Sequence, residues 1–270
     1  MLDNFSVLIA VTNGSNCEHF SKAISSVWDD QTIKPSQIVL VQDGPLNVEL
    51  QAEVNRWKLN LNNVLELVIY KEQKGLAYAL NIGLTKCQNE IVFRMDADDI
   101  SLSDRFERQL EFLMKHPQVD VLGAYIEEFE AIHGKNLIIR TVPTSHKKII
   151  HFARSRNPIS HPVVVFKKSA VLAVGGYPEH YPEDYFLWVK MIQAGFIFDN
   201  IPIVLLSMRT DKYFFDRRAM KMLLGEIRID LFMFKSRFIP FSKLFSNILL
   251  RSIVRLAPKT LKAFFYRHAR

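Results

Sequence analysis

The chain has few cysteines, no long apolar run and no basic leader segment. Cys17 and Cys87 are its two cysteines, which give neither a disulfide framework nor the paired spacing of a zinc site. A reducing compartment therefore fits the sequence. No apolar run reaches the ~18–20 residues that span a bilayer. The opening residues, Met1–Asn4, lack the basic segment of a secretory signal, so we expect no signal peptide.

Two glycine motifs that commonly mark nucleotide sites are also missing. The predicted first strand, Phe5–Val11, is followed by Thr12-Asn13-Gly14-Ser15-Asn16 and not by G-x-G-x-x-G. The P-loop pattern G-x-x-x-x-G-K-S/T occurs nowhere in the chain. A nucleotide bound here would need a metal ion, in place of a glycine cradle, to hold its phosphates.

The composition fits one folded domain with an extension. Hydrophobic residues make up 49% of the 270 positions and charged residues 23%, which is ordinary for a soluble protein with a large core. The net charge of +7 is unevenly spread. Residues 205–270 hold 15 of the 35 Lys and Arg residues and 4 of the 28 Asp and Glu residues, a balance of +11 against −4 for residues 1–204. A basic tail of this kind indicates an acidic partner.

Short apolar runs alternate with helical patterns in the first hundred residues. This alternation predicts βαβ units, and hence an α/β protein with a Rossmann-like, mostly parallel sheet flanked by helices. The expected strands of this half are Phe5–Val11, Ile38–Val41, Leu65–Tyr70 and Ile91–Met95. Beyond them we expect helices at Leu102–His116, His146–Arg154 and Glu183–Ala194, strands at Val119–Ile126, Leu137–Val142, Val163–Phe166 and Phe196–Leu206, and a turn at 133–136.

Carboxylates follow the ends of two predicted strands. Asp43 comes after the second strand, and Asp96, Asp98 and Asp99 follow the fourth. The carboxyl ends of parallel strands share one edge of the sheet, so these side chains should meet in one crevice. Mg²⁺ and Mn²⁺ favour carboxylate and phosphate oxygens, which predicts a metal-assisted nucleotide site. The alternative is a solvated turn that opens the next helix, with Ser101 or Asp104 as its N-cap.

The order of these motifs resembles the family 2 glycosyltransferases over residues 5–210. The resemblance rests on Gln42-Asp43-Gly44, Lys74-Gly75-Leu76-Ala77-Tyr78-Ala79-Leu80-Asn81, Arg94-Met95-Asp96-Ala97-Asp98-Asp99 with Arg105 behind it, Gly175-Gly176-Tyr177 and Glu183-Asp184-Tyr185. It implies the GT-A fold. Asp43-Gly44-Pro45 and Asn157-Pro158-Ile159-Ser160-His161-Pro162 are most similar to bacterial enzymes that build O-antigen and exopolysaccharide repeat units, such as the amylovoran type.

The resemblance also implies roles for single residues. Asp43 would contact the uracil or ribose of a UDP-sugar, Asp96 would lie by the ribose or sugar, and Asp98 would bind Mn²⁺ or Mg²⁺. Asp184 would be the general base of an inverting transfer, although capping of its helix is the structural alternative. Thr12 is assigned to the donor side, where the family usually has tyrosine, which argues against base stacking at that position.

For several other residues, a structural role explains their presence at least as well as a role in the site. Arg94 is assigned to the donor side, but pairing with the neighbouring carboxylates explains it as well. Glu183 and His161 are candidates for the acceptor site, and each can equally be a solvent-facing or structural residue. Arg105 can be an exposed helix residue that makes i,i+4 pairs. Asn81 is interpreted as structural.

The tail from residue 211 to 270 is predicted to form short basic amphipathic helices, cut at Pro240 and Pro258, beyond a transferase domain at 1–210. A solvated helical face and nucleic-acid binding are alternatives, and the acidic body without a recognition module argues against nucleic acid. We favour docking on an anionic membrane surface, because short basic helices with Phe, Leu and Ile lie in the interface without spanning it.

The functional hypothesis is the metal-dependent transfer of one sugar from a UDP-sugar to a polyprenyl-diphosphate-linked saccharide. Galactose is favoured by the resemblance, and the place of action would be the cytoplasmic face of the bacterial inner membrane. The Gln-x-x-Arg-Trp signature of processive synthases is absent, so one sugar per encounter is expected. A nucleotide-sugar pyrophosphorylase would need a glycine-rich basic loop after the first strand, which is missing here. A non-catalytic UDP-sugar-binding module stays open, as does the oligomeric state.

Overall fold

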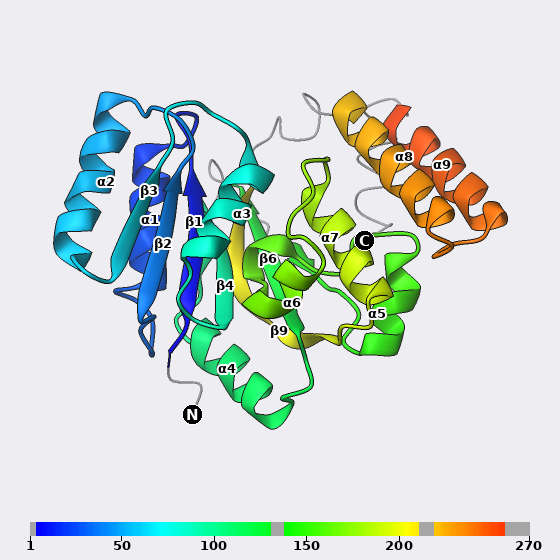
Figure 1. Cartoon of the computed structure of the whole chain (residues 1–270), viewed down its shortest axis with the longest axis horizontal. Helices are drawn as coiled ribbons and strands as arrows, with labels where there is room; N and C mark the ends of the chain where they lie inside the picture. Colours follow the sequence, from blue (N-terminus) through cyan, green and yellow to red (C-terminus); the bar gives the residue numbers. More distant parts are fainter. Residues whose placement is uncertain (1–3, 131–137, 211–218, 257–270) are drawn as a thin grey trace.

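The computed structural model describes residues 4–130, 138–210 and 219–256. Within these residues the strands form one nine-stranded sheet in the order β3-β2-β1-β4-β8-β6-β9-β5, and β7 pairs with β6 (Figure 1). The strands are β1 Ser6–Val11, β2 Gln37–Gln42, β3 Leu65–Ile69, β4 Ile91–Asp96, β5 Ile100–Ser101, β6 Val121–Glu130, β7 Ile138–Arg140, β8 Val165–Lys167 and β9 Phe198–Thr210.

The first four strands form a parallel half-sheet, as the sequence predicts. Pairs β1/β2, β1/β4 and β2/β3 are parallel, and β6 pairs with β9 in parallel as well. The pairs β4/β8, β6/β8, β6/β7 and β5/β9 are antiparallel. The sheet is thus parallel where the carboxylates of β2 and β4 emerge and mixed beyond β4.

Helices cover both faces of the sheet, which explains why the inner strands are apolar on both sides. Residues such as Val7, Ile9 and Phe93 pack against α1, α2 and α4 on one face, whereas Leu8 and Val92 pack against α3, α5, α6 and α7 on the other. These helices are α1 Cys17–Val27, α2 Val48–Leu61, α3 Leu76–Lys86, α4 Arg105–Lys115, α5 His146–Ala153, α6 Lys168–Ala173 and α7 Glu183–Gln193.

Local capping explains where several helices begin. The side chain of Asn16 accepts a hydrogen bond from the His19 amide at 3.0 Å at the start of α1, and Asn47 accepts one from the Leu50 amide at 2.9 Å at the start of α2. Helix α3 lies against the sheet at Gly83, where a Cβ would come within 2.3 Å of the Leu8 side chain. Side-chain bulk at that position would therefore push α3 away from the strands.

The last two described helices, α8 (Ala219–Lys235) and α9 (Phe241–Leu256), form a hairpin at one end of the molecule (Figure 1). The break between them falls at Pro240, as expected, but both helices are longer than the short segments that the sequence predicted. Buried side chains of these helices and of their connection share a hydrophobic cluster with α7: Tyr185, Phe186 and Val189 pack with Ile229, Met233, Ile239 and Leu244. The hairpin is thus packed onto the body through α7.

Most of the remaining predictions on secondary structure match within a few residues, with three additions. The sequence did not predict the two-residue strand β5, the short 3-10 helix His161–Val163 or the six-residue helix α6. The turn expected at 133–136 and the helix break expected at Pro258 lie outside the described residues. Among the helices that the structure describes, none is long and apolar enough to cross a membrane.

Candidate active site

Strand β4 ends in the acidic cluster that the sequence singles out. Its last residue, Asp96, pairs with Arg94 through both carboxylate oxygens, with Nη1 at 2.6 Å from Oδ2 and Nη2 bonded to Oδ1. Arg94 is buried, and the Asp96 side chain is partly accessible. The structural interpretation of Arg94, pairing with the carboxylates, is therefore confirmed. A donor contact through Asp96 or Arg94 stays a prediction.

Asp98 and Asp99 lie in the loop between β4 and β5 and are tied to the far end of β9. The Arg209 amide donates to Asp99 Oδ1 at 2.8 Å, and Arg209 Nε donates to the Asp98 carbonyl at 3.0 Å. Asp98 is exposed, yet the surrounding protein desolvates its carboxyl, which together with repulsion from Asp96 raises its pKa to about 6. Burial, followed by the Asp96 and Asp98 charges, raises the pKa of Asp99 well above its usual value.

This donor set fits a divalent cation in part. Asp99 Oδ2 is buried without a hydrogen-bond partner, and neighbouring carboxylates with raised pKa values favour a nearby positive charge. However, no three His, Cys, Asp or Glu side chains in the described segments are arranged to hold a metal ion by themselves. The protein thus resembles sites in which one or two carboxylates share Mg²⁺ or Mn²⁺ with substrate phosphates.

Asp43 shapes the loop that opens α3. Its Oδ1 accepts from the Lys74 amide at 2.7 Å and its Oδ2 from the Gly75 amide at 2.8 Å, and its side chain is 1% exposed. Gly75 has a φ of 97°, which an L side chain rarely adopts, so the loop depends on glycine there. The structure thus gives Asp43 a bracing role between β2 and α3, and a contact to a base or ribose stays a prediction.

Thr12 lies in the turn after β1. Its hydroxyl accepts from the Gly14 amide at 3.3 Å, and its carbonyl accepts from the Ser15 amide at 3.0 Å. The Thr12 side chain is half-buried, and the next two residues are exposed. The turn thus holds Thr12 at the carboxyl edge of the parallel half-sheet, where its assignment to the donor side stays a prediction.

Asp184 lies in the first turn of α7 and is held by a residue that the sequence reading did not single out as a site residue. Asn157 Nδ2 donates to Asp184 Oδ2 at 2.6 Å, and the Tyr185 amide donates to Oδ1 at 2.8 Å. Burial raises the pKa of Asp184, and the bonds from Asn157 and Tyr185, together with the charges of Arg94 and Arg140, oppose that rise. Its neighbour Glu183 also has a raised pKa, from burial and then repulsion by Asp184.

Arg94 links the two halves of the site electrostatically. Its positive charge lowers the pKa of both Asp98 and Asp184 against the effect of burial. The Asp96 charge likewise raises the pKa of Glu183. Arg94 therefore lies within electrostatic range of both the β4 carboxylates and the start of α7.

His161 is buried. Its Nε2 is 3.1 Å from the Tyr177 hydroxyl, and its ring lies beside those of Tyr177 and Trp188. Burial, with the Arg94 charge, lowers the pKa of His161 well below its usual value, so the ring is neutral. These contacts support its structural interpretation, and an acceptor contact stays a prediction.

The turn before α7 is held by Asn81, as its structural interpretation expects. Asn81 Nδ2 donates to the Tyr177 carbonyl at 2.8 Å, and Asn81 Oδ1 accepts from the Tyr177 amide at 2.7 Å. Gly176 has a φ of 72°, and a Cβ there would come within 2.4 Å of Asn81 Oδ1. Within the Gly175-Gly176-Tyr177 motif, Gly176 is therefore required both for its backbone conformation and for the space beside Asn81.

The interpretation of Arg105 as an exposed helix residue is wrong. Its side chain is 0% exposed and donates to the Arg94 carbonyl at 2.8 Å and to Gln109 Oε1 at 3.2 Å. Its guanidinium also lies over the rings of Phe93 and Phe106. Burial, with repulsion from Arg94, lowers the pKa of Arg105 to about 9. The i,i+4 partner exists, but it is an amide in the core and not a surface carboxylate.

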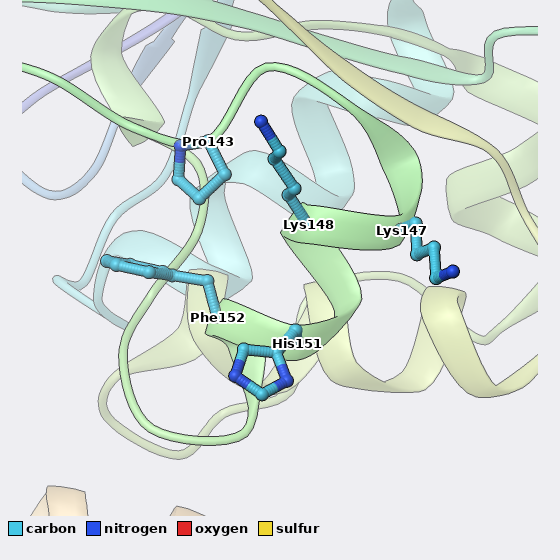
Figure 2. A pocket seen from close by; sticks show the side chains of 5 residues that line it. All are labelled: Pro143, Lys147, Lys148, His151 and Phe152. Atoms are coloured by element: carbon cyan, nitrogen blue, oxygen red, sulfur yellow. The ribbon is translucent and has the colours of Figure 1, made fainter.

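A surface hollow of about 540 Å³ lies beside α5 (Figure 2). It is lined by Pro143, Lys147, Lys148, His151 and Phe152, none of which is a predicted site residue. Figure 2 shows Lys147 and Lys148 pointing in different directions from the helix. The two lysines therefore do not converge on a common anion, and we assign the hollow no role.

Comparisons of the structure define the class of fold. The chain is similar to the mannosyltransferase PcManGT from Pyrobaculum calidifontis in complex with GDP-Man and Mn²⁺, with a TM-score of 0.67 and 17% identity over 93% of this chain and 69% of that one. It is equally similar, with a TM-score of 0.67 and 16% identity, to S. aureus TarS 1-349 in complex with UDP-GlcNAc, covering 93% of this chain and 72% of that one. The protein thus has the GT-A fold.

Sequence comparisons identify the family. The model of glycosyl transferase family 2 matches residues 6–172. The chain is 35% identical over 265 residues to the Escherichia coli UDP-Gal:alpha-D-GlcNAc-diphosphoundecaprenol beta-1,3-galactosyltransferase, covering 97% of this chain and 95% of the relative. It is 38% identical to the amylovoran biosynthesis glycosyltransferase AmsE of Erwinia amylovora, covering 97% of each. The chain therefore belongs to glycosyl transferase family 2 and is a glycosyltransferase.

Proposed function

We propose that this glycosyltransferase moves one galactose from UDP-galactose to an N-acetylglucosamine carried on a polyprenyl diphosphate, during synthesis of an O-antigen or exopolysaccharide repeat unit. The observation that carries this proposal is the 35% identity with the E. coli galactosyltransferase over 97% of this chain. The amylovoran relative, which matches over a similar length, supports a role in repeat-unit synthesis.

Asp184 is the proposed general base. An acceptor hydroxyl is a weak nucleophile near neutral pH, and a positioned carboxylate that takes its proton contributes about 10²–10⁴-fold to the rate. Each Asp184 oxygen accepts one hydrogen bond from the protein and keeps a lone pair for the acceptor hydroxyl. Its raised pKa makes it a stronger base than an ordinary aspartate.

The donor end of the proposed site combines carboxylates with two arginines. Asp98, with Asp96 and Asp99 beside it, would hold Mn²⁺ or Mg²⁺, and such an ion acts as a Lewis acid that offsets charge on the departing UDP. Arg209, which donates to the Asp98 carbonyl, supplies a guanidinium suited to the diphosphate oxygens. Arg94 holds Asp96 in place through their paired bonds.

The C-terminal hairpin is the proposed contact with an anionic membrane on the cytoplasmic face of the inner membrane. On α9, Phe241, Phe245, Leu249 and Ile253 recur every four residues and are 49–67% exposed, so they form one apolar face. Exposed apolar residues also lie on α8: Met220, Leu224, Leu231 and Phe234. The ring centroids of Phe234 and Phe241 are 6.0 Å apart, which joins the two faces. We call these eight residues the apolar face of the hairpin.

The charges of the hairpin support the same orientation. Arg228, Lys235 and Arg237 are exposed, as a surface that meets anionic lipid requires. Arg251 and Arg255 instead pair within the hairpin, Arg251 with Asp230 and Arg255 with Glu226. A helix that lies in the interface buries its apolar face in the lipid and keeps its cations at the headgroups.

A donor and acceptor screen tests the proposed function. Purified protein, Mn²⁺ and each of a panel of nucleotide sugars are incubated with N-acetylglucosamine-diphosphoprenol, and released nucleoside diphosphate and the lipid product are measured. We expect UDP release and a product larger by one hexose with UDP-galactose. Binding of UDP without turnover of any donor would instead identify a non-catalytic binding module.

A further inference from the structure

Asn157 occupies a short segment that is held from three sides. The segment runs from Ala153, the last residue of α5, to Asn157. The side chain of Asn157 donates a hydrogen bond of 2.6 Å to Asp184. Tyr185, the residue after Asp184, donates its hydroxyl to the Ala153 carbonyl at 2.6 Å. The segment and the start of α7 are therefore joined at both ends of a five-residue stretch.

The C-terminal hairpin holds the middle of this segment. Asn247 Nδ2 donates to the Arg154 carbonyl at 2.8 Å, and Arg251 Nη2 donates to the Ser155 carbonyl at 2.8 Å. Asp230 on α8 orients both donors, because its Oδ1 accepts from Asn247 at 2.9 Å and its carboxylate lies 3.0 Å from Arg251 Nε.

Two of these hairpin side chains are buried, and Arg251 is partly buried. Asp230 is 0% exposed and Asn247 is 4% exposed, so their polar groups depend on these bonds in place of water. A buried carboxylate without such partners would destabilise the fold, so Asp230 depends on Asn247 and Arg251, the same side chains that donate to the carbonyls of residues 154 and 155.

We infer that the C-terminal hairpin positions the candidate base: Asn247 and Arg251, held by Asp230, fix the 153–157 segment so that Asn157 orients Asp184. Asn157 and the hairpin residues are thus positioning residues, and the inference rests on the proposed role of Asp184. The hairpin would then join the membrane contact and the acceptor end of the active site in one rigid unit, so that a lipid-linked acceptor meets an ordered base.

The acid limb of the pH profile of kcat, where the rate rises as the base loses its proton, reports whether Asn157 is positioned to bind Asp184. Asn157 donates to the ionised form of Asp184, so loss of that bond raises the pH at which Asp184 loses its proton. A hydrogen bond to a charged group corresponds to a shift of about one to two pH units. None of the other charged or titratable groups around Asp184 is substituted in the experiment. These groups are Arg94 of β4, Arg140 of β7, Glu183 of α7, Tyr177 and Tyr181.

The experiment compares Asn157→Ala, Asn247→Ala and Asn247→Gln in the full chain. We expect Asn157→Ala to move the acid limb up by about one to two units. We expect Asn247→Ala to move it in the same direction, and Asn247→Gln, which keeps an amide donor, to restore part of that shift. Leu244→Ala is the matched control, because Leu244 packs in the same hairpin cluster. It should lower the melting temperature without moving the limb.

Two results overturn the inference in different ways. Wild-type kcat in Asp184→Asn would remove the proposed base and this inference with it. If Asp184→Asn is inactive while Asn247→Ala has an unshifted limb, or a shift matched by Leu244→Ala, the proposed function stands and the positioning role of the hairpin is wrong.

Discussion

We predict that the apolar face of the hairpin contributes to membrane binding. Phe241 and Phe245 on α9 are 67% and 62% exposed, and replacing both with Ser removes two aromatic rings from that face without opening the core. The fold should therefore be kept. The double variant should instead have a lower affinity for anionic vesicles.

The magnitude follows from the exposed surface. Full burial of a Phe side chain stabilises by about 1.5–3 kcal/mol, so transfer of about two-thirds of each ring into lipid contributes about 1–2 kcal/mol. Both rings together contribute about 2–4 kcal/mol. Since about 1.4 kcal/mol corresponds to a factor of ten, the double variant should bind roughly 30-fold or more weakly.

Cosedimentation with vesicles measures this difference. Vesicles rich in phosphatidylglycerol are compared with neutral phosphatidylcholine vesicles, at low and high salt. We expect wild-type binding to prefer the anionic vesicles and to weaken with salt, because Arg228, Lys235 and Arg237 are exposed. The control is Val48→Ser with Leu59→Ser, since these α2 residues are 88% and 82% exposed and α2 lies at the opposite end of the molecule from α8 and α9 (Figure 1).

Two outcomes would refute this reasoning. One is a Phe241→Ser/Phe245→Ser protein that sediments with anionic vesicles as well as the wild type. The other is an equal loss of binding in the α2 control, which would mean that exposed apolar residues act without regard to their position.

Three further predictions concern the active site. Asp98→Asn should raise the half-saturating Mn²⁺ concentration in the transfer assay by about tenfold or more, and an unchanged value would exclude Asp98 as a ligand. Gly176→Ala should lower the free energy of unfolding in urea by roughly 1–3 kcal/mol, because it adds a clash with Asn81 to an unfavourable φ. Gly195→Ala, with a φ of 87° and open space around its Cβ, is its control and should lose less. Because the pKa of Asp184 is raised and the base must be ionised, kcat should rise with pH through a limb above the usual pKa of aspartate, and a flat acid side would contradict the base role.

The parallel half of the sheet is predictable from the sequence because its strands are covered on both faces. Residues of β2, for example, are buried without exception, and its central residues Ile38–Val41 form a continuous apolar run between two glutamines. Strand β5 has only two residues and α6 only six, which is too short for a hydrophobic period to appear. For β5, the antiparallel pairing with the distant strand β9 decides the structure.

The candidate site is predictable only where its residues belong to a motif. The carboxylates after β2 and β4 are visible in sequence, since they directly follow apolar runs. Arg209 meets Asp99 across 110 positions of sequence, and Asn157 meets Asp184 across 27, so no local pattern predicts either contact. The sequence signal for Asn157 was its place in the Asn157–Pro162 motif.

The burial of charged residues was the least predictable feature. Arg105 follows an acidic loop at the start of an amphipathic helix, which is compatible with an exposed position, but tertiary contacts with Arg94 and Gln109 place it in the core. In the tail, the same alternation of basic and apolar residues contains Arg251, which is paired inside the hairpin, and Arg228, which is exposed. Which side of a helix meets a neighbour is set by packing, and composition does not encode it.

The most direct test of the central claim is the transfer reaction itself with its proposed base removed. Wild-type protein and Asp184→Asn are each incubated with UDP-galactose, Mn²⁺ and N-acetylglucosamine-diphosphoprenol, and the lipid product is analysed by mass spectrometry. We expect the wild type to add one hexose, and Asp184→Asn, although folded and able to bind UDP, to be slower by about 10²–10⁴-fold. Transfer at the wild-type rate by Asp184→Asn, or no hexose added by the wild type, would contradict the account.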